Sequence, residues 1–512
     1  MIVTATLAGP LLGGGLADRV AEIVERPEFA GSTFGIVFRD LESGAPIYEL
    51  NPQALLPPAS TTKLVSCGGA LAVLGKDFRW ETPLVRTGPV IDGVLQGDLV
   101  LVASGDPNLS QRVTGEGRLL FADRDHSYAG FSESALVPGD PLRILREMAR
   151  KVRESGIVEV QGDVLVDDGL FAEMQDGFVG PFSAVCINDN LVDITIEPGA
   201  DAGEAPVVRR QPDLSIVEVE NAAITGARGS TTDIWVEPIA GVASFEVRGT
   251  VAAGSPATLR VGRLAQPALA AAHYLAELLE SEGVRLGGSR RQARFGPSVY
   301  RTYPVVAKHV SPPLSEAVRV ALKVSQNLHA TMLPVVVGSV RGERGDRYSG
   351  YRAIRRRLEA AGLDCASVVL HSGSGGGRMD RLSADFVADF LRYMARRDDF
   401  LEFYDALPVG GVDGTLSGRF RSKALRGLVR AKTGTLVYRG AFNDRWIYLA
   451  KSLAGYVDLR QGEDPGRMLV FSIAIANTVC DDRAEGAERL FRAQEDIIEA
   501  VVGSLGGVAA AR

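Results

Sequence analysis

Three short patterns in this sequence combine residue types that together can carry out acyl transfer. A serine hydroxyl becomes an effective nucleophile only when a neighbouring base takes its proton. Lysine supplies only 8 of the 56 basic residues, so a lysine in two of the three patterns is less expected by chance. In chain order, the patterns are Ser60-x-x-Lys63, Ser325-Gln326-Asn327 and Lys432-Thr433-Gly434.

The residues that follow Ser60 are spaced as on a helix with one buried face. Residues three positions apart share a helix face, so Ser60 and Lys63 can touch. A lysine acts as a base only when neutral, which requires burial or a nearby positive charge, and Lys432 is a candidate for that charge. Backbone N–H groups at the helix start could stabilise an oxyanion. The apolar positions that recur at three, four and three residues are Leu64, Cys67, Leu71 and Leu74.

The other two patterns are expected on a strand and beside a helix. AKTGTL is typical of a strand, in which Lys432 and Gly434 face the same way. Lys432 could then pair with a substrate carboxylate, while Gly434 leaves room for a substrate along the strand. Ser325 and Asn327 point the same way only in a loop or strand, yet LSEAVRVALKVSQNLHATMLPVVVG around them predicts a helix.

Each pattern also has a purely structural interpretation. Ser60 could be the N-cap of its helix. Lys63 could be a surface lysine whose stem covers apolar neighbours. Ser325 and Asn327 could cap a helix, and Lys-Thr-Gly could end a strand at a turn. The ordered set of three would then be a coincidence of composition.

The order of predicted elements indicates helices at both ends of the chain and strands between them. Helical patterns cover residues 16–30 and 484–505, and short β-type runs with Gly, Pro and Asp turns fill the region from about 84 to 305. We therefore predict an α/β (α+β) fold. Residues 1–83 and 306–512 would build one domain, and residues 84–305 would form a β-rich insertion.

Composition narrows the range of functions. A chain of 512 residues is expected to hold two or more domains. Its net charge of −7, without a basic block, argues against nucleic acid as a partner. No apolar run reaches the roughly 18 residues that a membrane helix needs. The cysteines are scattered and the histidines form no H-E-x-x-H, so we expect no metal and no other cofactor.

The N-terminal MIVTATLAGPLLGGG is uncharged and fairly apolar. It lacks the cationic start of a signal peptide. It is therefore either a clipped signal or a first strand and loop.

Beyond these patterns, the chain resembles the low-molecular-mass class C penicillin-binding proteins, the D-alanyl-D-alanine carboxypeptidase/endopeptidase family. About 260 residues separate Ser60 from Ser325, which is similar to the large inserted domains of that family and unlike a compact β-lactamase. The segments that carry the resemblance are SGDPNL (104–109), INDNLVDITIEPG (187–199), LPVGGVDGTLSGR (407–419), AKTGTL (431–436) and SLAGYV (452–457).

The resemblance implies a penicillin-binding serine transpeptidase-like domain, an antiparallel sheet flanked by helices, with a large β-rich insertion. It implies that Ser60 attacks the D-Ala-D-Ala carbonyl and that Lys63 accepts its proton. Ser325 would relay a proton to the leaving D-alanine, while Asn327 and Lys432 organise the site.

The resemblance also implies how the substrate is held. Thr433, Gly434 and Thr435 would line the substrate strand, and the two threonines would contact its carboxylate and acyl chain. Backbone N–H groups of Ser60 and Thr435 would form the oxyanion hole. The substrates would be peptidoglycan peptides, β-lactams would trap Ser60, and the enzyme would act in the periplasm or elsewhere outside the cytoplasm.

Three departures from the family pattern leave other functions open. Ser372 stands where the family has Asp, His329 and Thr331 alter the usual N-L-Y-A-E, and about ten extra residues separate AKTGTL from SLAGYV. One alternative is a β-lactamase or esterase on the same fold. The other is a catalytically silent protein that binds the cell wall.

Overall fold

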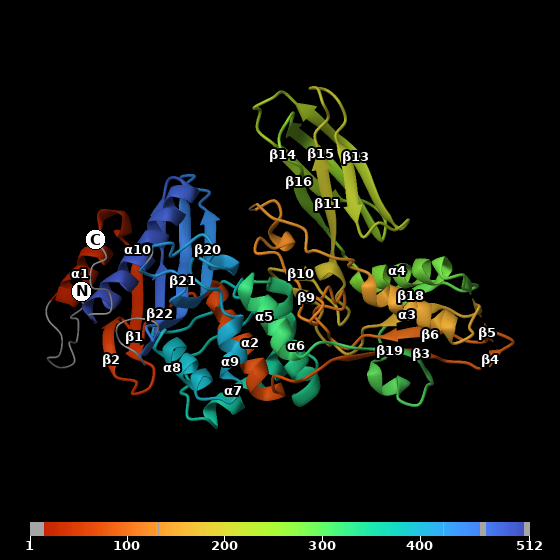
Figure 1. The fold of residues 1–512 in the computed structure, drawn as a ribbon, viewed down its shortest axis with the longest axis horizontal. Coiled ribbons are helices and arrows are strands. Elements are labelled where there is room, and N and C mark those ends of the chain that lie inside the picture. The colour runs from red at the N-terminus through yellow and green to blue at the C-terminus, as the bar shows by residue number, and fades with distance from the viewer. Residues whose placement is uncertain (1–14, 132, 423, 461–466, 506–512) are drawn as a thin grey trace. The chain divides into compact units, whose positions relative to one another are not determined.

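The computed structural model describes residues 15–131, 133–422, 424–460 and 467–505 (Figure 1). The N-terminal segment, for which a signal remnant or a first strand was expected, lies outside these residues apart from Gly15. The chain divides into two compact units. The first comprises Met1–Lys76, Ala321–Ala330 and Tyr351–Arg512, and the second comprises Asp77–Val320 and Thr331–Gly350.

The predicted β-rich insertion, residues 84–305, lies wholly within the second unit. The division of the chain at 83/84 and 305/306 stays a prediction. Within the described ranges, no helix combines the length and the hydropathy that crossing a membrane requires.

An antiparallel sheet forms the centre of the first unit. Its strand order is β2-β1-β22-β21-β20, and β23 pairs with β21 beside this path. Every neighbouring pair is antiparallel. The strands are β1 (Thr33–Asp40), β2 (Pro46–Leu50), β20 (Val429–Arg439), β21 (Trp446–Asp458), β22 (Met468–Ala476) and β23 (Thr478–Cys480).

Alternation along the strands explains why helices cover both faces of this sheet (Figure 1). Successive side chains of a strand point to opposite faces. Ile36 and Phe38 of β1 join a buried core with α1 (Gly15–Val24) and α10 (Arg483–Ser504). Val37, between them, packs on Ala384 and Ala388 of α8 (Ala384–Ala395) instead.

The chain contains further helices, of which α5 and α6 each include residues of both units. The sequence did not predict α9. The 3-10 helices of the first unit are η1 (Pro27–Phe29), η2 (Ala59–Thr61) and η6 (Gly414–Leu416). The remaining helices are α2 (Thr62–Leu74), α5 (Leu314–Lys323), α6 (Asn327–Arg341), α7 (Arg347–Glu359) and α9 (Phe400–Ala406).

The second unit is rich in short strands, as the sequence predicted. Its sheets have the orders β18-β8-β6-β3-β19, β17-β7-β5-β4, β13-β15-β14, β12-β11-β16 and β10-β9. Its helices include α3 (Arg143–Glu154) and α4 (Pro267–Ser281), with 3-10 turns η3 (His126–Tyr128), η4 (Asn188–Asn190) and η5 (Pro297–Tyr300). The strands are β3 (Glu81–Arg86), β4 (Val90–Ile91), β5 (Val94–Leu95), β6 (Leu99–Val102), β7 (Glu159–Val160), β8 (Val164–Asp167), β9 (Gln175–Asp176), β10 (Gly180–Pro181), β11 (Leu191–Glu197), β12 (Val207–Gln211), β13 (Val217–Gly226), β14 (Asp233–Pro238), β15 (Ala243–Ala252), β16 (Thr258–Arg263), β17 (Arg285–Leu286), β18 (Arg290–Ala293) and β19 (Val305–Val310).

Candidate active site

Ser60 lies in the tight 3-10 turn η2, directly before helix α2. Its predecessor Ala59 has a φ of 47°, a left-handed conformation that is strained for a residue with a Cβ. Thr61 Oγ1 donates to the Pro58 carbonyl at 2.7 Å and braces the turn. The turn therefore fixes where the Ser60 hydroxyl points before the helix begins.

Lys63 is fully buried, and its Nζ is surrounded by oxygen atoms. It donates to Ser60 Oγ at 2.8 Å, to Asn327 Oδ1 at 2.7 Å and to the Ser374 carbonyl at 2.8 Å. The serine and lysine of the first pattern thus meet, and the asparagine of the second pattern joins them. All of these groups belong to the first unit.

The protonation of Lys63 is set by burial and by a second lysine. Burial first, and then the charge of Lys432, lowers the pKa of Lys63 well below its usual range. Burial also lowers the pKa of Lys432 to about 7. A low pKa makes the neutral amine, the form that can act as a base, available near neutral pH.

Ser325 and Asn327 lie at a break between two helices, so the single helix predicted across them is wrong. α5 ends at Lys323 and α6 begins at Asn327. Ser325 between them has a left-handed φ of 62°. The end of α5 is anchored because Lys323 Nζ donates to the Leu407 carbonyl at 2.7 Å and to Asp413 Oδ2 at 2.6 Å. The backbone between the helices is therefore a loop, one of the two geometries in which both side chains can point the same way.

Lys432 and Gly434 lie on β20 and face the Ser60 turn. Lys432 is fully buried, and its Nζ donates to the Thr433 carbonyl at 2.8 Å. A Cβ placed on Gly434 would lie 3.0 Å from the Ser60 backbone nitrogen and 2.7 Å from the Pro58 carbonyl oxygen. The strand and the turn therefore pack so closely that only glycine fits at position 434.

Thr433 and Thr435 point away from that face, as the alternation of a strand requires. Thr433 Oγ1 donates to Thr415 Oγ1 at 3.0 Å. Thr435 Oγ1 accepts from Lys451 Nζ at 2.8 Å. The two hydroxyls are thus held by residues that the sequence patterns did not single out.

A loop between α7 and α8 supplies a further wall of the site. Its Ser374 carbonyl accepts from Lys63, and its Gly373 carbonyl accepts from Ser66 Oγ at 2.7 Å. Ser372, which replaces the family aspartate, donates through Oγ to the buried Asp380 at 2.8 Å. A carboxylate therefore still supports this loop, although it comes from a different position. The role of Ser374 could not be predicted, because a backbone carbonyl carries no residue-type information.

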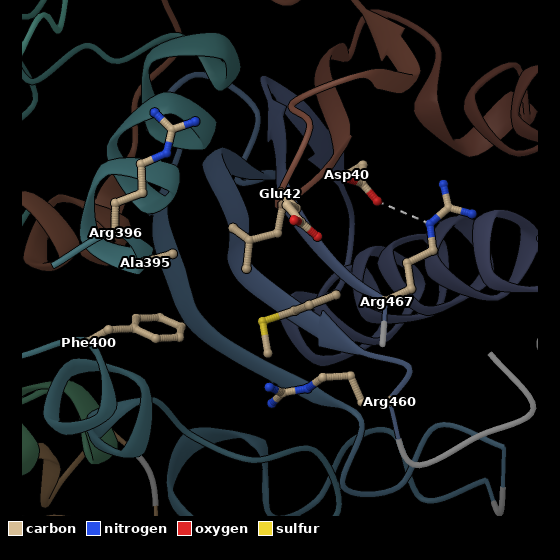
Figure 2. Close-up of a pocket in the computed structure, with 9 residues that line it drawn as sticks. Asp40, Glu42, Ala395, Arg396, Phe400, Arg460 and Arg467 are labelled. Atoms are coloured by element: carbon tan, nitrogen blue, oxygen red, sulfur yellow. Dashed lines mark hydrogen bonds and ion pairs between the residues drawn. The ribbon is translucent and has the colours of Figure 1, made fainter. Parts of the chain in front are cut away.

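A separate hollow of about 340 Å³ is lined by residues of the first unit that are far from these patterns in the sequence (Figure 2). Two of the lining residues form a hydrogen bond, which Arg467 donates to Asp40. Arg460, which also lines it, pairs with Asp458. The described residues that line it include no serine, threonine, cysteine, lysine or histidine. The hollow therefore lacks the groups that acyl transfer requires.

Among the described residues of the second unit, an acid–histidine cluster has the spacing of a metal site. Ligand atoms of Asp125, His126 and Asp189 lie within 4.8 Å of one another. Both ring nitrogens of His126 are already bonded, Nδ1 to Asp193 at 2.6 Å and Nε2 to Asp189 at 2.7 Å. Burial opposes charge on the ring, but the two carboxylates outweigh it and raise the pKa of His126 well above its usual range. Because both ring nitrogens are already bonded to carboxylates, we describe the cluster as an ion network.

Known proteins resemble this chain over nearly its whole length. A D-alanyl-D-alanine carboxypeptidase of Actinomadura sp. (strain R39) is 29% identical over 481 residues, which cover 90% of this chain and 80% of that protein. The D-alanyl-D-alanine carboxypeptidase DacB of Haemophilus influenzae is 24% identical over 451 residues, covering 85% of this chain and 84% of its own.

The fold matches as well. The crystal structure of penicillin binding protein 4 (dacB) from Haemophilus influenzae superposes with a TM-score of 0.72 at 20% identity, over 94% of this chain and 99% of that one. This likeness confirms the predicted penicillin-binding fold. The family model for D-Ala-D-Ala carboxypeptidase 3 (S13) matches residues 16–496. The chain therefore belongs to the D-Ala-D-Ala carboxypeptidase 3 (S13) family and is a serine-type carboxypeptidase.

Proposed function

We propose that the chain is a serine D-Ala-D-Ala carboxypeptidase/endopeptidase that cleaves peptidoglycan stem peptides through an acyl-enzyme on Ser60. The observation that carries this proposal is the 2.8 Å contact between the Lys63 amine and the Ser60 hydroxyl in a fully buried setting. A nucleophile within hydrogen-bond reach of its base is the arrangement that covalent catalysis requires.

The surroundings of Lys63 support its role as the base. A neutral amine keeps two N–H donors and one lone pair. The Asn327 amide oxygen and the Ser374 carbonyl are acceptors only, and they take those two donors. The lone pair is left facing Ser60 Oγ, where it can accept the hydroxyl proton.

The reaction then proceeds in two steps. Ser60 Oγ attacks the carbonyl carbon of the penultimate D-alanine, and its proton passes to Lys63. The C–N bond to the terminal D-alanine breaks, and Ser325 relays a proton to the leaving amine. Water attacks the resulting ester, restores the Ser60 hydroxyl and releases a peptide shortened by one residue.

The backbone around Ser60 stabilises the charge that develops in both steps. We assign the oxyanion hole to the N–H groups of Ser60 and Thr435, since Gly434 brings strand β20 against the Ser60 turn. Lys432 adds a positive charge. Because β20 is an edge strand of its sheet, a substrate strand along this edge can meet Gly434 on one side and the hydroxyls of Thr433 and Thr435 on the other, and the hydroxyls bind its terminal carboxylate.

The same chemistry predicts inhibition by β-lactams and action outside the cytoplasm. A β-lactam would acylate Ser60 and leave slowly. The Haemophilus influenzae penicillin binding protein 4 has been crystallised with a β-lactam, and its structure has a TM-score of 0.69 to this chain. Peptidoglycan peptides lie in the periplasm or elsewhere outside the cytoplasm, so we place the enzyme there.

The proposal is tested by measuring D-alanine release from a stem peptide together with labelling by a fluorescent penicillin. Wild type is expected to release D-alanine and to retain the label, and Ser60→Ala is expected to do neither. Rapid turnover of the penicillin would point to a β-lactamase instead. Binding to sacculi without D-alanine release would point to a silent cell-wall protein, and either result would overturn the proposal.

A further inference from the structure

Lys451 is a buried lysine for which the reaction just described has no use. It lies on β21 and is only 4% exposed. The buried Lys323 has the carboxylate of Asp413 as its ion partner. Among the described residues, Lys451 Nζ has no carboxylate at ion-pair distance, and its polar side-chain contact is the Thr435 hydroxyl. Buried amines without a counter-ion are costly, and such groups cluster at functional sites.

The neighbours of Lys451 make its positive charge harder to hold. Burial first, and then the charges of Arg419 and Arg483, lowers the pKa of Lys451 well below its usual range. The Arg419 guanidinium is itself paired with Glu495 at 3.0 Å. The ring of Phe491 on α10 lies 3.8 Å from Lys451 Nζ and offers only a cation–π contact. These surroundings favour the neutral amine, and a carboxylate arriving beside it would favour its charged form.

The register of the sheet places Lys451 on β21, next to β20, the strand along which we expect the substrate to bind. Thr435 and Lys451 are directly paired between β20 and β21. Thr435 is exposed, whereas Lys451 reaches its hydroxyl from the buried side. Lys451 Nζ donates this hydrogen bond, so it occupies a lone pair of Thr435 Oγ1. The single hydrogen of the threonine hydroxyl is then left to donate elsewhere.

We propose that Lys451 is a positioning residue for Thr435, whose hydroxyl it turns into a donor directed at the terminal carboxylate of the acyl donor. This inference rests on the proposed function, because it assumes that the substrate carboxylate binds at Thr435. The carboxylate supplies the negative charge that the surroundings of Lys451 lack. Lys451 thereby sets the preference of the enzyme for substrates that end in a free carboxylate.

The test compares benzylpenicillin with its methyl ester, which lacks the carboxylate. The measured quantity is the ratio of the two second-order acylation rate constants. Lys451→Met is expected to lower this ratio about tenfold, the usual size of one lost hydrogen bond to a charged group. Lys451→Gln keeps a donor without the charge, and its ratio is expected to lie between those of Lys451→Met and wild type. The exposed Lys308→Met serves as the control and keeps the wild-type ratio.

A purely structural role predicts a different result. If the substitution only distorted β20, acylation by benzylpenicillin and by its methyl ester would slow by the same factor. The ratio of the two rate constants would then stay unchanged, and this result would overturn the inference. If Lys451→Met does not fold, as judged by thermal melting, the same criterion is applied to Lys451→Gln. Thr435→Val supplies a second check. Adding Lys451→Met to Thr435→Val is expected to lower the ratio no further, and multiplicative effects would contradict the coupling.

The outcome also separates this inference from the proposed function. A wild-type protein that is not acylated on Ser60 would overturn both. Normal acylation of wild type with an unchanged ratio in the Lys451 variants would overturn the role of Lys451 alone.

Discussion

Lys63 Nζ and Asn327 Oδ1 are joined by a hydrogen bond of 2.7 Å although 264 residues separate them in the chain. The large β-rich region inserted between the two residues does not disturb this contact, because both belong to the first unit. The bond fixes the orientation of the Lys63 amine. It therefore ties the proposed base to the helix break that also carries Ser325.

Replacing Lys63 with methionine is expected to abolish acylation while the fold is kept. Methionine has a similar volume but provides no base, and positioned bases contribute about 10²- to 10⁴-fold to rates. The rate of penicillin acylation is measured by stopped-flow or gel labelling. Lys76→Met, which breaks a half-exposed ion pair with Glu402, serves as the control and is expected to retain full activity. An acylation rate within a few-fold of wild type in Lys63→Met would contradict the role of the base.

The pH dependence of acylation is expected to be bell-shaped. Lys63 must be neutral, so the rate rises as pH increases through its lowered pKa. Lys432 must stay charged, so the rate falls as pH rises through about 7, its own pKa. Lys432→Arg keeps the charge at high pH and should remove the falling limb. Lys432→Met removes the charge that depresses the pKa of Lys63, so the rising limb should move to higher pH. A rising limb that stays in place in Lys432→Met would contradict the coupling between the two lysines.

Gly434→Ala is expected to destabilise the protein and to suppress acylation. The added Cβ would come within 3.0 Å of the Ser60 nitrogen and force the strand from the turn. Overpacking of this kind costs about 1–3 kcal/mol. Gly418→Ala is the matched control, since its Cβ meets no atom within 4 Å. The free energy of unfolding and the acylation rate are measured for both variants. If both variants had the same free energy of unfolding and the same acylation rate, the strand and the turn would not be in close contact.

His126 is expected to stabilise the second unit most at acidic pH. Its pKa is raised in the folded state by Asp193 and Asp189 against the effect of burial. The stabilisation is therefore complete below the unfolded pKa of about 6.5 and is lost as pH rises through the folded value. His126→Gln leaves two buried carboxylates without their partner and should cost about 3 kcal/mol below pH 6.5. Thermal unfolding of both proteins across pH checks this. A cost that grows with rising pH would contradict the assignment.

Much of the fold could be predicted from the spacing of apolar residues, because the buried face of a helix or strand requires apolar side chains at regular positions. The alternation in AKTGTL predicted β20, and the pattern of residues 484–505 predicted α10 within one residue at each end. The break at Ser325 could not be predicted. The residues on both sides of it are helix-forming, and the contact of the neighbouring Lys323 with Asp413 joins residues 90 positions apart in the sequence.

The candidate site was predictable only as far as its side chains form motifs. Ser60, Lys63 and Asn327 lie in short patterns, and the structure joins them through hydrogen bonds. The Ser374 carbonyl has no residue-type signature. Lys451 lies in an ordinary strand pattern. Its contact with Thr435 depends on the register between β20 and β21, which only the folded sheet defines.

The central claim is that the Ser60 hydroxyl is the group that becomes acylated. The most direct measurement is intact-protein mass spectrometry after brief exposure to benzylpenicillin, followed by peptide mapping. The account predicts one penicilloyl group per chain, on the peptide that contains Ser60, and no adduct on Ser60→Ala. An adduct on another residue, or an unmodified wild-type protein, would contradict it.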